Sequence, residues 1–233
     1  MAGHAPGSSE VAVIGGGVVG VACALELARR GAEVVVLDRG AVGCGCSHGN
    51  AGWLTPSLAK PLAAPGQARK ALKWLLDPES PFYIRPRADP ALAAWLLGFV
   101  LAGRSRERFE RGRAALIELC NWSVDAWEAL AARSPEPFGY ARNGLLEVFE
   151  TAEAFVAGRA AAAAIEALGV PSEPWTAEQV PGREPAIRGR VVGGLFFPRD
   201  AQCEPDRAVR ALRAEAERAG ARFVEGAEVI GAE

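Results

Sequence analysis

The first residues in this chain that could do chemistry are three glycines in the pattern G-x-G-x-x-G. They are Gly15, Gly17 and Gly20, and a short apolar run at residues 11–14 precedes them. In such a pattern the first glycine allows a tight turn, the second lets the backbone approach a pyrophosphate, and the third lets a helix pack on a strand. Free N–H groups at the start of the following helix attract phosphate, because the helix dipole is positive there. The spacing therefore predicts a dinucleotide site.

Two strands and a helix must position these glycines. The sequence predicts the first strand at 11–14, a helix at 17–30 that stops at Gly31, and a second buried strand at 33–37. Asp38 closes the second strand, at the place where an acid that hydrogen-bonds a ribose 2′-hydroxyl belongs. Because these elements follow one another in register, we interpret residues 10–40 as a nucleotide-binding βαβ unit.

A membrane span is the alternative interpretation of the same stretch. Residues 11–27 are almost wholly apolar, and Gly16 and Gly20 form a G-x-x-x-G spacing. Three successive glycines, Glu26 inside the run and Arg29 directly after it interrupt the apolar character. The clean stretch is then shorter than the about 20 residues that a span needs, so the nucleotide-binding interpretation is favoured.

Composition bounds the class of protein. The chain has 233 residues, of which 50% are hydrophobic, and a net charge of −2, which predicts a soluble globular protein with a sizeable core. The most basic run, 104–113, interleaves arginine with glutamate as a solvated helix face does, so no nucleic-acid partner is expected. Five cysteines without a secretory signal favour reduced thiols in the cytoplasm. Cys44 and Cys46 lack the second pair that a zinc site needs, so no metal is expected.

The run of small residues after Asp38 carries a second motif. Residues 47–52, Ser-His-Gly-Asn-Ala-Gly, match the S-x-x-N-A-G pattern, and the chain here resembles the FAD-dependent amino-acid oxidoreductases of the D-amino-acid oxidase family. Residues 53–57 and 60–66 look most like the small subunit of bacterial D-amino-acid dehydrogenases. The resemblance implies FAD as the cofactor. An NAD-dependent dehydrogenase, the alternative, would share the first 40 residues but would not explain the motif at 47–52.

The resemblance also implies which residues hold FAD. The backbone at Val18 and Val19 would bind the pyrophosphate, Asp38 and Arg39 the adenosine ribose, and the backbone of Val229 the adenine. The remaining residues fall where the family holds the pyrophosphate, the ribityl chain and the flavin edge: Cys46, Ser47, Asn50, Ala51, Gly52 and Trp53. His48 is interpreted as an exposed loop histidine, with covalent flavin attachment as the alternative.

The rest of the chain predicts a second, substrate-binding domain. Repeated prolines between residues 78 and 90 mark the crossing, and the predicted segments are 9–77 (FAD-binding), 78–195 (substrate) and 196–233 (FAD-binding). Helices are expected at 65–76, 90–102, 104–133, 151–168 and 205–219, and strands at 145–149, 191–197, 222–224 and 227–230. The apolar helix at 90–102 is expected to be buried, and membrane or partner contact is its alternative. The fold class is α/β: a Rossmann-like βαβ domain of the glutathione-reductase type with an inserted α+β domain, its C-terminal part absent.

The implied function is removal of a hydride from the α-carbon of an amino acid or secondary amine, with quinone or oxygen as the electron acceptor. FAD performs the redox step, so few protein acids or bases are needed. No Ser/His/Asp or Cys/His pattern is present, and no catalytic residue is assigned. Because family members are longer, the sequence is expected to be a truncated product. Two alternatives therefore stay open: a non-catalytic FAD-binding fragment, and a subunit completed by another chain. The expected location is the cytoplasm, with peripheral contact at the inner face of the membrane as a further alternative.

Overall fold

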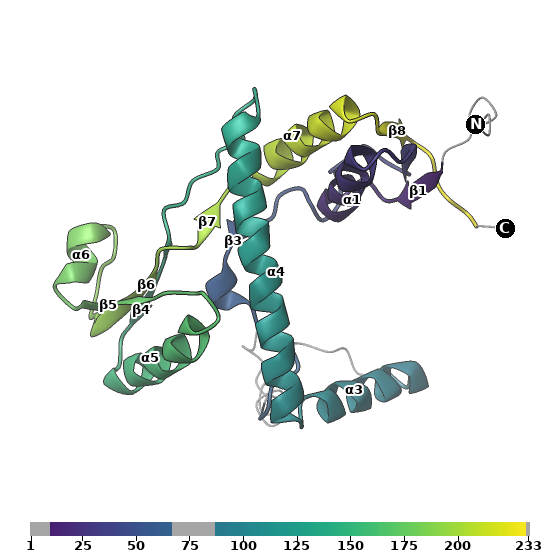
Figure 1. The fold of residues 1–233 in the computed structure, drawn as a ribbon. Helices are drawn as coiled ribbons and strands as arrows, with labels where there is room; N and C mark the ends of the chain where they lie inside the picture. Colours follow the sequence, from purple (N-terminus) through teal and green to yellow (C-terminus); the bar gives the residue numbers. More distant parts are fainter. Residues whose placement is uncertain (1–9, 67–86, 232–233) are drawn as a thin grey trace. The chain divides into compact units, whose positions relative to one another are not determined.

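The computed structural model describes residues 10–66 and 87–231, which form two compact units (Figure 1). The first unit lies within residues 1–54, 123–144 and 200–233, and the second within 55–122 and 145–199. Residues 123–144, which the predicted division gives to the substrate domain, cluster with the βαβ residues. The three-segment division into domains stays a prediction.

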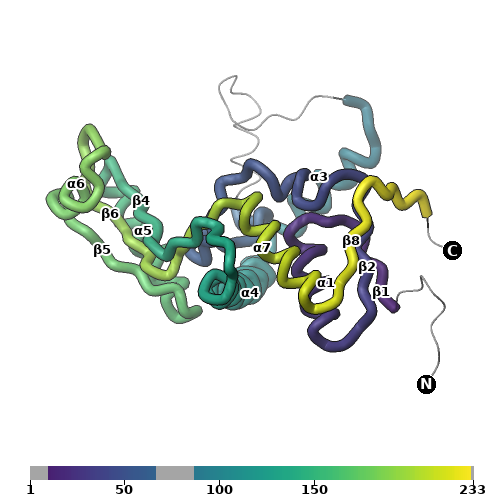
Figure 2. The backbone as a smooth tube through the Cα atoms, turned by 90° about the horizontal axis from the view of Figure 1, so that it is seen from above, coloured from purple at the N-terminus to yellow at the C-terminus, as the bar shows by residue number. Residues whose placement is uncertain are grey.

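A parallel sheet is the centre of the first unit. Its strand order is β1 (Val11–Ile14), β2 (Val34–Asp38) and β8 (Arg222–Glu225), and β8 lies beside β2 in Figure 2. Val11 pairs with Val34, and Asp38 pairs with Glu225, so the carboxyl ends of β2 and β8 meet at one edge. The prediction that the chain returns at residue 222 to the sheet opened by residues 11–14 is confirmed.

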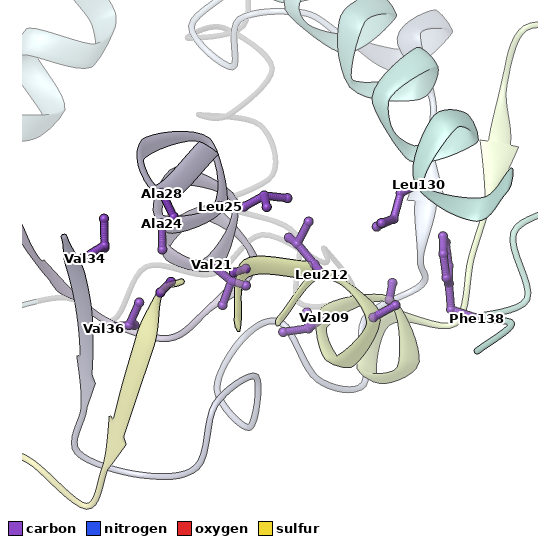
Figure 3. Close-up of a cluster of buried hydrophobic side chains, with 14 residues drawn as sticks. Val21, Ala24, Leu25, Ala28, Val34, Val36, Leu130, Phe138, Val209 and Leu212 are labelled. Carbon is purple, nitrogen blue, oxygen red and sulfur yellow. The ribbon is translucent and has the colours of Figure 1, made fainter. Parts of the chain in front are cut away.

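Two helices bury their apolar faces together in the first unit (Figure 3). Helix α1 (Val18–Arg29) buries Val21, Ala24, Leu25 and Ala28, the one-sided spacing of an amphipathic helix. Helix α7 (Pro205–Arg218) contributes Val209 and Leu212 to the same cluster. Strand β3 (Trp53–Leu54) pairs antiparallel with β7 (Ala201–Gln202). The predicted helix at 17–30 is confirmed, with Gly17 and Arg30 as its caps.

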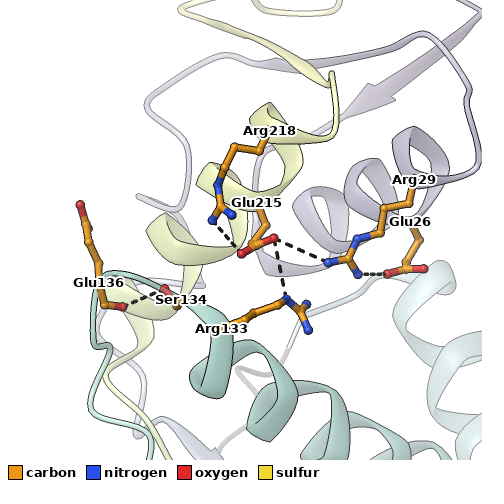
Figure 4. A network of polar contacts seen from close by, with 7 residues as sticks. All are labelled: Glu26, Arg29, Arg133, Ser134, Glu136, Glu215 and Arg218. Carbon is orange, nitrogen blue, oxygen red and sulfur yellow. Dashed lines mark hydrogen bonds and ion pairs between the residues drawn. The ribbon is translucent and has the colours of Figure 1, made fainter.

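A buried carboxylate joins three helical segments of the first unit (Figure 4). Glu215 of α7 is 7% exposed and forms ion pairs with Arg218 at 2.7 Å, Arg29 at 3.7 Å and Arg133 at 3.8 Å. Arg29 belongs to α1, and Arg133 is the last residue of α4 (Arg106–Arg133). A buried charge needs such partners to offset its lost hydration. This network fixes the side of α7 against α1.

An antiparallel sheet is the centre of the second unit. Strand β6 (Gly193–Phe197) lies between β4 (Leu145–Phe149) and β5 (Glu173–Thr176). Helix α5 (Ala152–Glu166) contacts β6 and β4, and Ile117 and Leu195 are among the buried side chains. The unit also holds η1 (Pro56–Leu58), α6 (Gln179–Arg183), α3 (Pro90–Ala102) and the first part of α4. Strands at 145–149 and 193–197 confirm the predictions for those segments.

Two sequence expectations are wrong. Residues 227–230 form no strand, because Gly226 adopts a φ of 71° and only the Ala227 N–H, donating to the Asp38 carbonyl, continues the pairing with β2. Helix α3 forms as predicted but has no buried residue. Among the described residues, no helix is long and apolar enough to cross a membrane. Residues 67–76 of the predicted helix at 65–76, and the prolines at 78, 81 and 86, lie outside the described residues.

Candidate functional site

The glycine turn (residues 15–20) has the backbone shape that the motif predicts. Gly15 has a φ of 101°, a conformation that side chains disfavour, and its N–H donates to the Leu37 carbonyl at 2.8 Å. A Cβ on Gly20 would lie 2.0 Å from the Gly15 carbonyl oxygen. The helix can therefore begin against the turn only because Gly20 has no side chain.

The start of α1 offers backbone N–H groups that the protein does not use. Gly17 caps the helix without a side chain, and the first turn has no acidic residue. The Val18 N–H donates to the Ser47 hydroxyl at 2.9 Å. Within the described part of the chain the Val19 and Gly20 N–H groups have no acceptor, and Val19 is 73% exposed. Two free donors at the positive end of a helix of 12 residues form an anion site that suits a phosphate.

Asp38 lies at the end of β2 and links the glycine turn to the chain that follows it. Its Oδ1 accepts from the Gly40 N–H at 2.8 Å, and its Oδ2 accepts from the Gly16 N–H at 2.6 Å. These backbone donors, Gly40 first and then Gly16, lower the pKa of Asp38, and neighbouring Arg39 lowers it further. The carboxylate is therefore ionised at neutral pH. It accepts two hydrogen bonds and has acceptor capacity for about two more.

The small-residue loop (residues 39–52) is held by its own polar side chains. The Asn50 amide donates to the carbonyls of Cys46 and Ser47, both at 3.3 Å, and its oxygen accepts from the Gly52 N–H at 2.9 Å. Gly52 has a φ of 65°, and a Cβ there would lie 2.0 Å from the Cys203 carbonyl oxygen. Asn50 therefore fixes the loop, and Gly52 lets it pass close to the chain before α7.

Three contributors to this site were not singled out from the sequence. A Cβ on Gly16 would lie 2.9 Å from Val42 Cγ2, so the loop packs on the turn at a position that the motif leaves open. Glu225, at the end of β8, accepts from the Val42 N–H at 2.8 Å and from Arg213 at 2.9 Å. The hydrogen bond from Val42 and the charge of Arg213 lower the Glu225 pKa. Gly16 is the middle residue of three successive glycines, which is a visible signal in the sequence, whereas nothing local marks Val42 or Glu225.

The structure brings some of the predicted cofactor residues together and leaves others apart. Hydrogen bonds join the glycine turn, Asp38 and Ser47 into one cluster. Trp53 is 60% exposed and pairs with Gln202 in the β3–β7 ribbon. Val229 is half-buried in the irregular segment after β8. The other predicted residues, Arg39, Cys46 and Ala51, are exposed, as is His48. The roles of these residues toward a cofactor stay predictions.

Comparison of the sequence with known protein families identifies the family of this chain. The family described as FAD dependent oxidoreductase (DAO) matches residues 10–233, which is nearly the whole chain. The chain belongs to this family. FAD is therefore the cofactor of the family, and the resemblance seen in residues 47–52 is confirmed.

Curated relatives are similar to this chain in sequence as well. A "D-amino acid dehydrogenase 2" from Ralstonia nicotianae is 37% identical over 81% of this chain and 45% of its own length. A "D-amino acid dehydrogenase" from Methylobacterium nodulans is 35% identical over 94% of this chain and 53% of its own. The chain thus spans about half the length of the curated relatives that it matches.

Solved structures confirm the fold class. L-proline dehydrogenase from P. horikoshii superimposes with a TM-score of 0.68 at 22% identity, covering 96% of this chain and 46% of that protein. Glycine oxidase from Bacillus cereus gives a TM-score of 0.60 at 19% identity, covering 96% and 47%. At these identities the likeness shows the fold alone. The α/β fold class predicted from the sequence is therefore confirmed for this chain.

The residues present fit FAD. The open N–H groups of Val19 and Gly20 suit the pyrophosphate, and the absence of side chains at the glycine turn leaves its backbone accessible. The Asp38 carboxylate, with acceptor capacity to spare, suits a ribose hydroxyl. The fit concerns the adenosine diphosphate portion, because this is the portion that the glycine turn and Asp38 serve.

Proposed function

We propose that the protein to which this chain belongs oxidises the CH–NH bond of a D-amino acid, using FAD. The observation that carries the proposal is the pair of unused N–H groups, those of Val19 and Gly20, at the start of α1 beside the Asp38 carboxylate in a chain of this family. Relatives named D-amino acid dehydrogenases, at 35–37% identity, support the choice of substrate class.

Each residue of the cluster has a proposed task. The Val18, Val19 and Gly20 N–H groups bind the pyrophosphate, the Val18 N–H being shared with Ser47. Asp38 accepts a ribose hydroxyl while it keeps its bonds to the Gly16 and Gly40 N–H groups. Arg39, Cys46, Ala51 and the backbone of Val229 complete the contacts with FAD.

The chemistry needs little from protein acids and bases. Bound FAD supplies a flavin ring that takes the hydride from the substrate α-carbon, and water then hydrolyses the imine product. The protein's part is to bind the amino acid with its α-hydrogen facing the ring and its amine neutral. Trp53, 60% exposed at the end of the small-residue loop, is proposed as a wall beside the ring.

The purified chain can test this proposal through its visible spectrum. We expect a flavin band that acid precipitation releases into the supernatant, and that D-amino acids bleach under anaerobic conditions while L-amino acids do not. Restoring the band with oxygen, or only with a quinone, would then identify the acceptor. A band that stays on the pellet would assign covalent attachment to a residue such as His48. A protein that takes up no FAD contradicts the cofactor site.

A second candidate function follows from the length of the chain. Since it spans 45–53% of those relatives, a non-catalytic FAD-binding fragment or a subunit completed by another chain is the alternative. The same spectrum separates the two. Bound flavin that no amino acid bleaches, but that is bleached once the remaining part of a relative is added, supports the subunit. Asp38→Ala is the control for both candidate functions. Each function requires the ribose contact, so the variant should lose FAD affinity in either case.

A further inference from the structure

A short ribbon in the first unit carries an aromatic and an amide side chain on one face. Strand β3 pairs with β7 so that Trp53 lies directly opposite Gln202, and a bridge places Ala141 on the other side of Gln202. All three residues belong to the first unit, and residues directly opposite one another in an antiparallel pair point to the same face. Trp53 is 60% exposed, and Gln202 is exposed as well. The ribbon therefore presents an indole and a carboxamide side by side.

The backbone of Gln202 is held on both sides, whereas its side chain is free. Its N–H donates to the Ala141 carbonyl, and its carbonyl accepts from the Ala141 N–H, both at 2.9 Å. The Cys203 N–H donates to the Gly52 carbonyl at 2.9 Å, and because bonded and non-bonded pairs alternate, Trp53 and Gln202 form the non-bonded kind, in which side chains are closest. Within residues 10–66 and 87–231 the Gln202 carboxamide has no hydrogen-bond partner. A donor and an acceptor are thus unused beside Trp53.

The opposite face of the ribbon is turned to the protein. Ala201 is 5% exposed, and Cys203 and Tyr140 pack against the cluster that α1 and α7 form. Successive side chains of a strand point to opposite faces, so Gln202 points away from this core. The packing of its neighbours therefore directs the carboxamide outward.

The small-residue loop connects this outward face to the anion site at the start of α1. The Ser47 hydroxyl accepts from the Val18 N–H, and the loop ends at Gly52, whose carbonyl is bonded to the ribbon. Asp38 lies at the start of the loop and is proposed to bind the adenosine ribose. When a diphosphate occupies the anion site, the second half of a dinucleotide can follow the loop away from Asp38. The ribbon lies where the loop ends.

A carboxamide matches the polar edge of a flavin ring. That edge is an imide, in which an N–H donor lies between two carbonyl acceptors. A glutamine amide offers one donor and one acceptor side by side, as it does to the donor and acceptor edge of adenine in DNA. The indole of Trp53 offers an apolar surface to the ring itself. Ala141, on the other side of Gln202, adds only a methyl group to this face.

We propose that the Gln202 carboxamide binds the imide edge of the flavin ring, beside Trp53. The contact rests on the proposed function, because it requires FAD at the glycine turn. It adds a residue from β7 to a site that the motifs place in residues 15–53. A hydrogen bond to the ring strengthens when the ring is reduced and carries more negative charge. The contact should therefore tighten FAD binding and raise the reduction potential of the bound flavin.

Titration calorimetry with FAD and with ADP tests this contact without any turnover. ADP contains only the part of FAD that the glycine turn and Asp38 bind, so it is an internal control. We expect the unchanged chain to bind FAD about tenfold or more tightly than ADP. Gln202→Ala should weaken FAD binding about fivefold and leave ADP binding unchanged. Arg142→Ala is the matched control, because the Arg142 guanidinium pairs with Glu128 at 3.0 Å, and it should alter neither affinity.

The reduction potential of the bound flavin gives a second readout. Gln202→Glu keeps the length of the side chain but replaces the N–H donor with a carboxylate, which repels the reduced ring. The potential should fall below that of the unchanged chain, and Arg142→Ala should keep the unchanged value. Titration against a redox dye measures it. Circular dichroism checks folding, and Gln202→Glu takes the place of Gln202→Ala in calorimetry if the alanine variant does not fold.

The outcomes distinguish the flavin contact from the proposed oxidation. A chain that binds ADP, but FAD no more tightly, overturns the contact alone, as does a folded Gln202→Ala variant that binds FAD as the unchanged chain does. A chain that binds neither compound overturns the FAD site and the contact with it. FAD binding that depends on Gln202, in a chain whose flavin no D-amino acid bleaches, supports the contact and contradicts the oxidation.

Discussion

The glycine turn and the small-residue loop contact each other but obtain their shapes by opposite means. The turn depends on missing side chains: Gly15 adopts a φ of 101°, and Gly20 leaves room for a carbonyl oxygen. The loop depends on side chains that are present, because Ser47 and Asn50 accept from or donate to nearby backbone groups. The turn consequently keeps N–H groups free for a ligand, while the loop uses its polar groups to hold itself and the turn in place.

Gly20→Ala should break the turn and give the largest effect. The added Cβ would lie 2.0 Å from the Gly15 carbonyl oxygen, so turn and helix must separate. We expect the free energy of unfolding to fall by about 3 kcal/mol or more, and FAD uptake to be lost with it. Urea denaturation followed by circular dichroism measures the first, and the flavin band the second.

Gly45→Ala is the control for this substitution. Gly45 lies in the loop, has no atom within 4 Å of an added Cβ and does not adopt a positive φ. It should change stability by less than about 0.5 kcal/mol. Equal stability of the two variants would mean that the turn tolerates a side chain, and that its shape does not depend on Gly20.

Asn50→Ala should loosen the loop while leaving the turn intact. The substitution removes two exposed donated hydrogen bonds and one part-buried accepted bond, and we expect a loss of about 1–2 kcal/mol in the free energy of unfolding. Asn50→Asp keeps the acceptor for the Gly52 N–H, so its stability should fall less than that of Asn50→Ala. Chemical denaturation compares the three proteins, and hydrogen exchange at residues 46–52 locates the change. An Asn50→Ala protein with unchanged exchange in the loop would refute this role.

The same contrast explains how much of the site could be predicted from the sequence. The turn is local, because glycines at fixed spacing between an apolar strand and an amphipathic helix identify it. Asp38 could be predicted as well, because it is the acid that ends β2. The hydrogen bond from Val42 to Glu225 joins residues 183 positions apart, and no local pattern encodes it. The strand predicted at 227–230 failed for a related reason, since alternating apolar residues do not reveal whether a partner strand is available. For α3, hydropathy predicted the helix but could not say what covers it.

Ser47→Ala tests whether the loop supports the start of α1. The hydroxyl accepts from the Val18 N–H at 2.9 Å, as a helix cap does, and its loss should cost about 1 kcal/mol. Because Ser47 is also proposed to contact the pyrophosphate, FAD affinity should fall as well. Cys44→Ala is the control, because Cys44 is exposed in the same loop, its side chain makes no hydrogen bond within the described residues, and it is not among the proposed FAD contacts. If FAD affinity rises instead, Ser47 competes with the phosphate for the Val18 N–H.

The smallest expected effect on stability concerns Asp38, the residue that bonds to both regions at once. Its carboxylate accepts from Gly16 in the turn and Gly40 in the loop, and both bonds lower its pKa in the folded protein. A lowered folded pKa means that the stabilisation is fully present above the ordinary aspartate value of about 3.9, and is lost as the pH falls through the folded value. Compared with Asp38→Asn, the unchanged chain should therefore be more stable at pH 5–8. That difference in melting temperature should shrink below about pH 4.

Glu225→Gln gives the matched comparison, because the Glu225 carboxylate accepts from Val42 in the loop but has no bond to the turn. If both substitutions abolish FAD uptake equally, the link through Asp38 has no special role in joining turn and loop. If only Asp38→Asn does so, the ribose acid is also the residue that aligns the two regions.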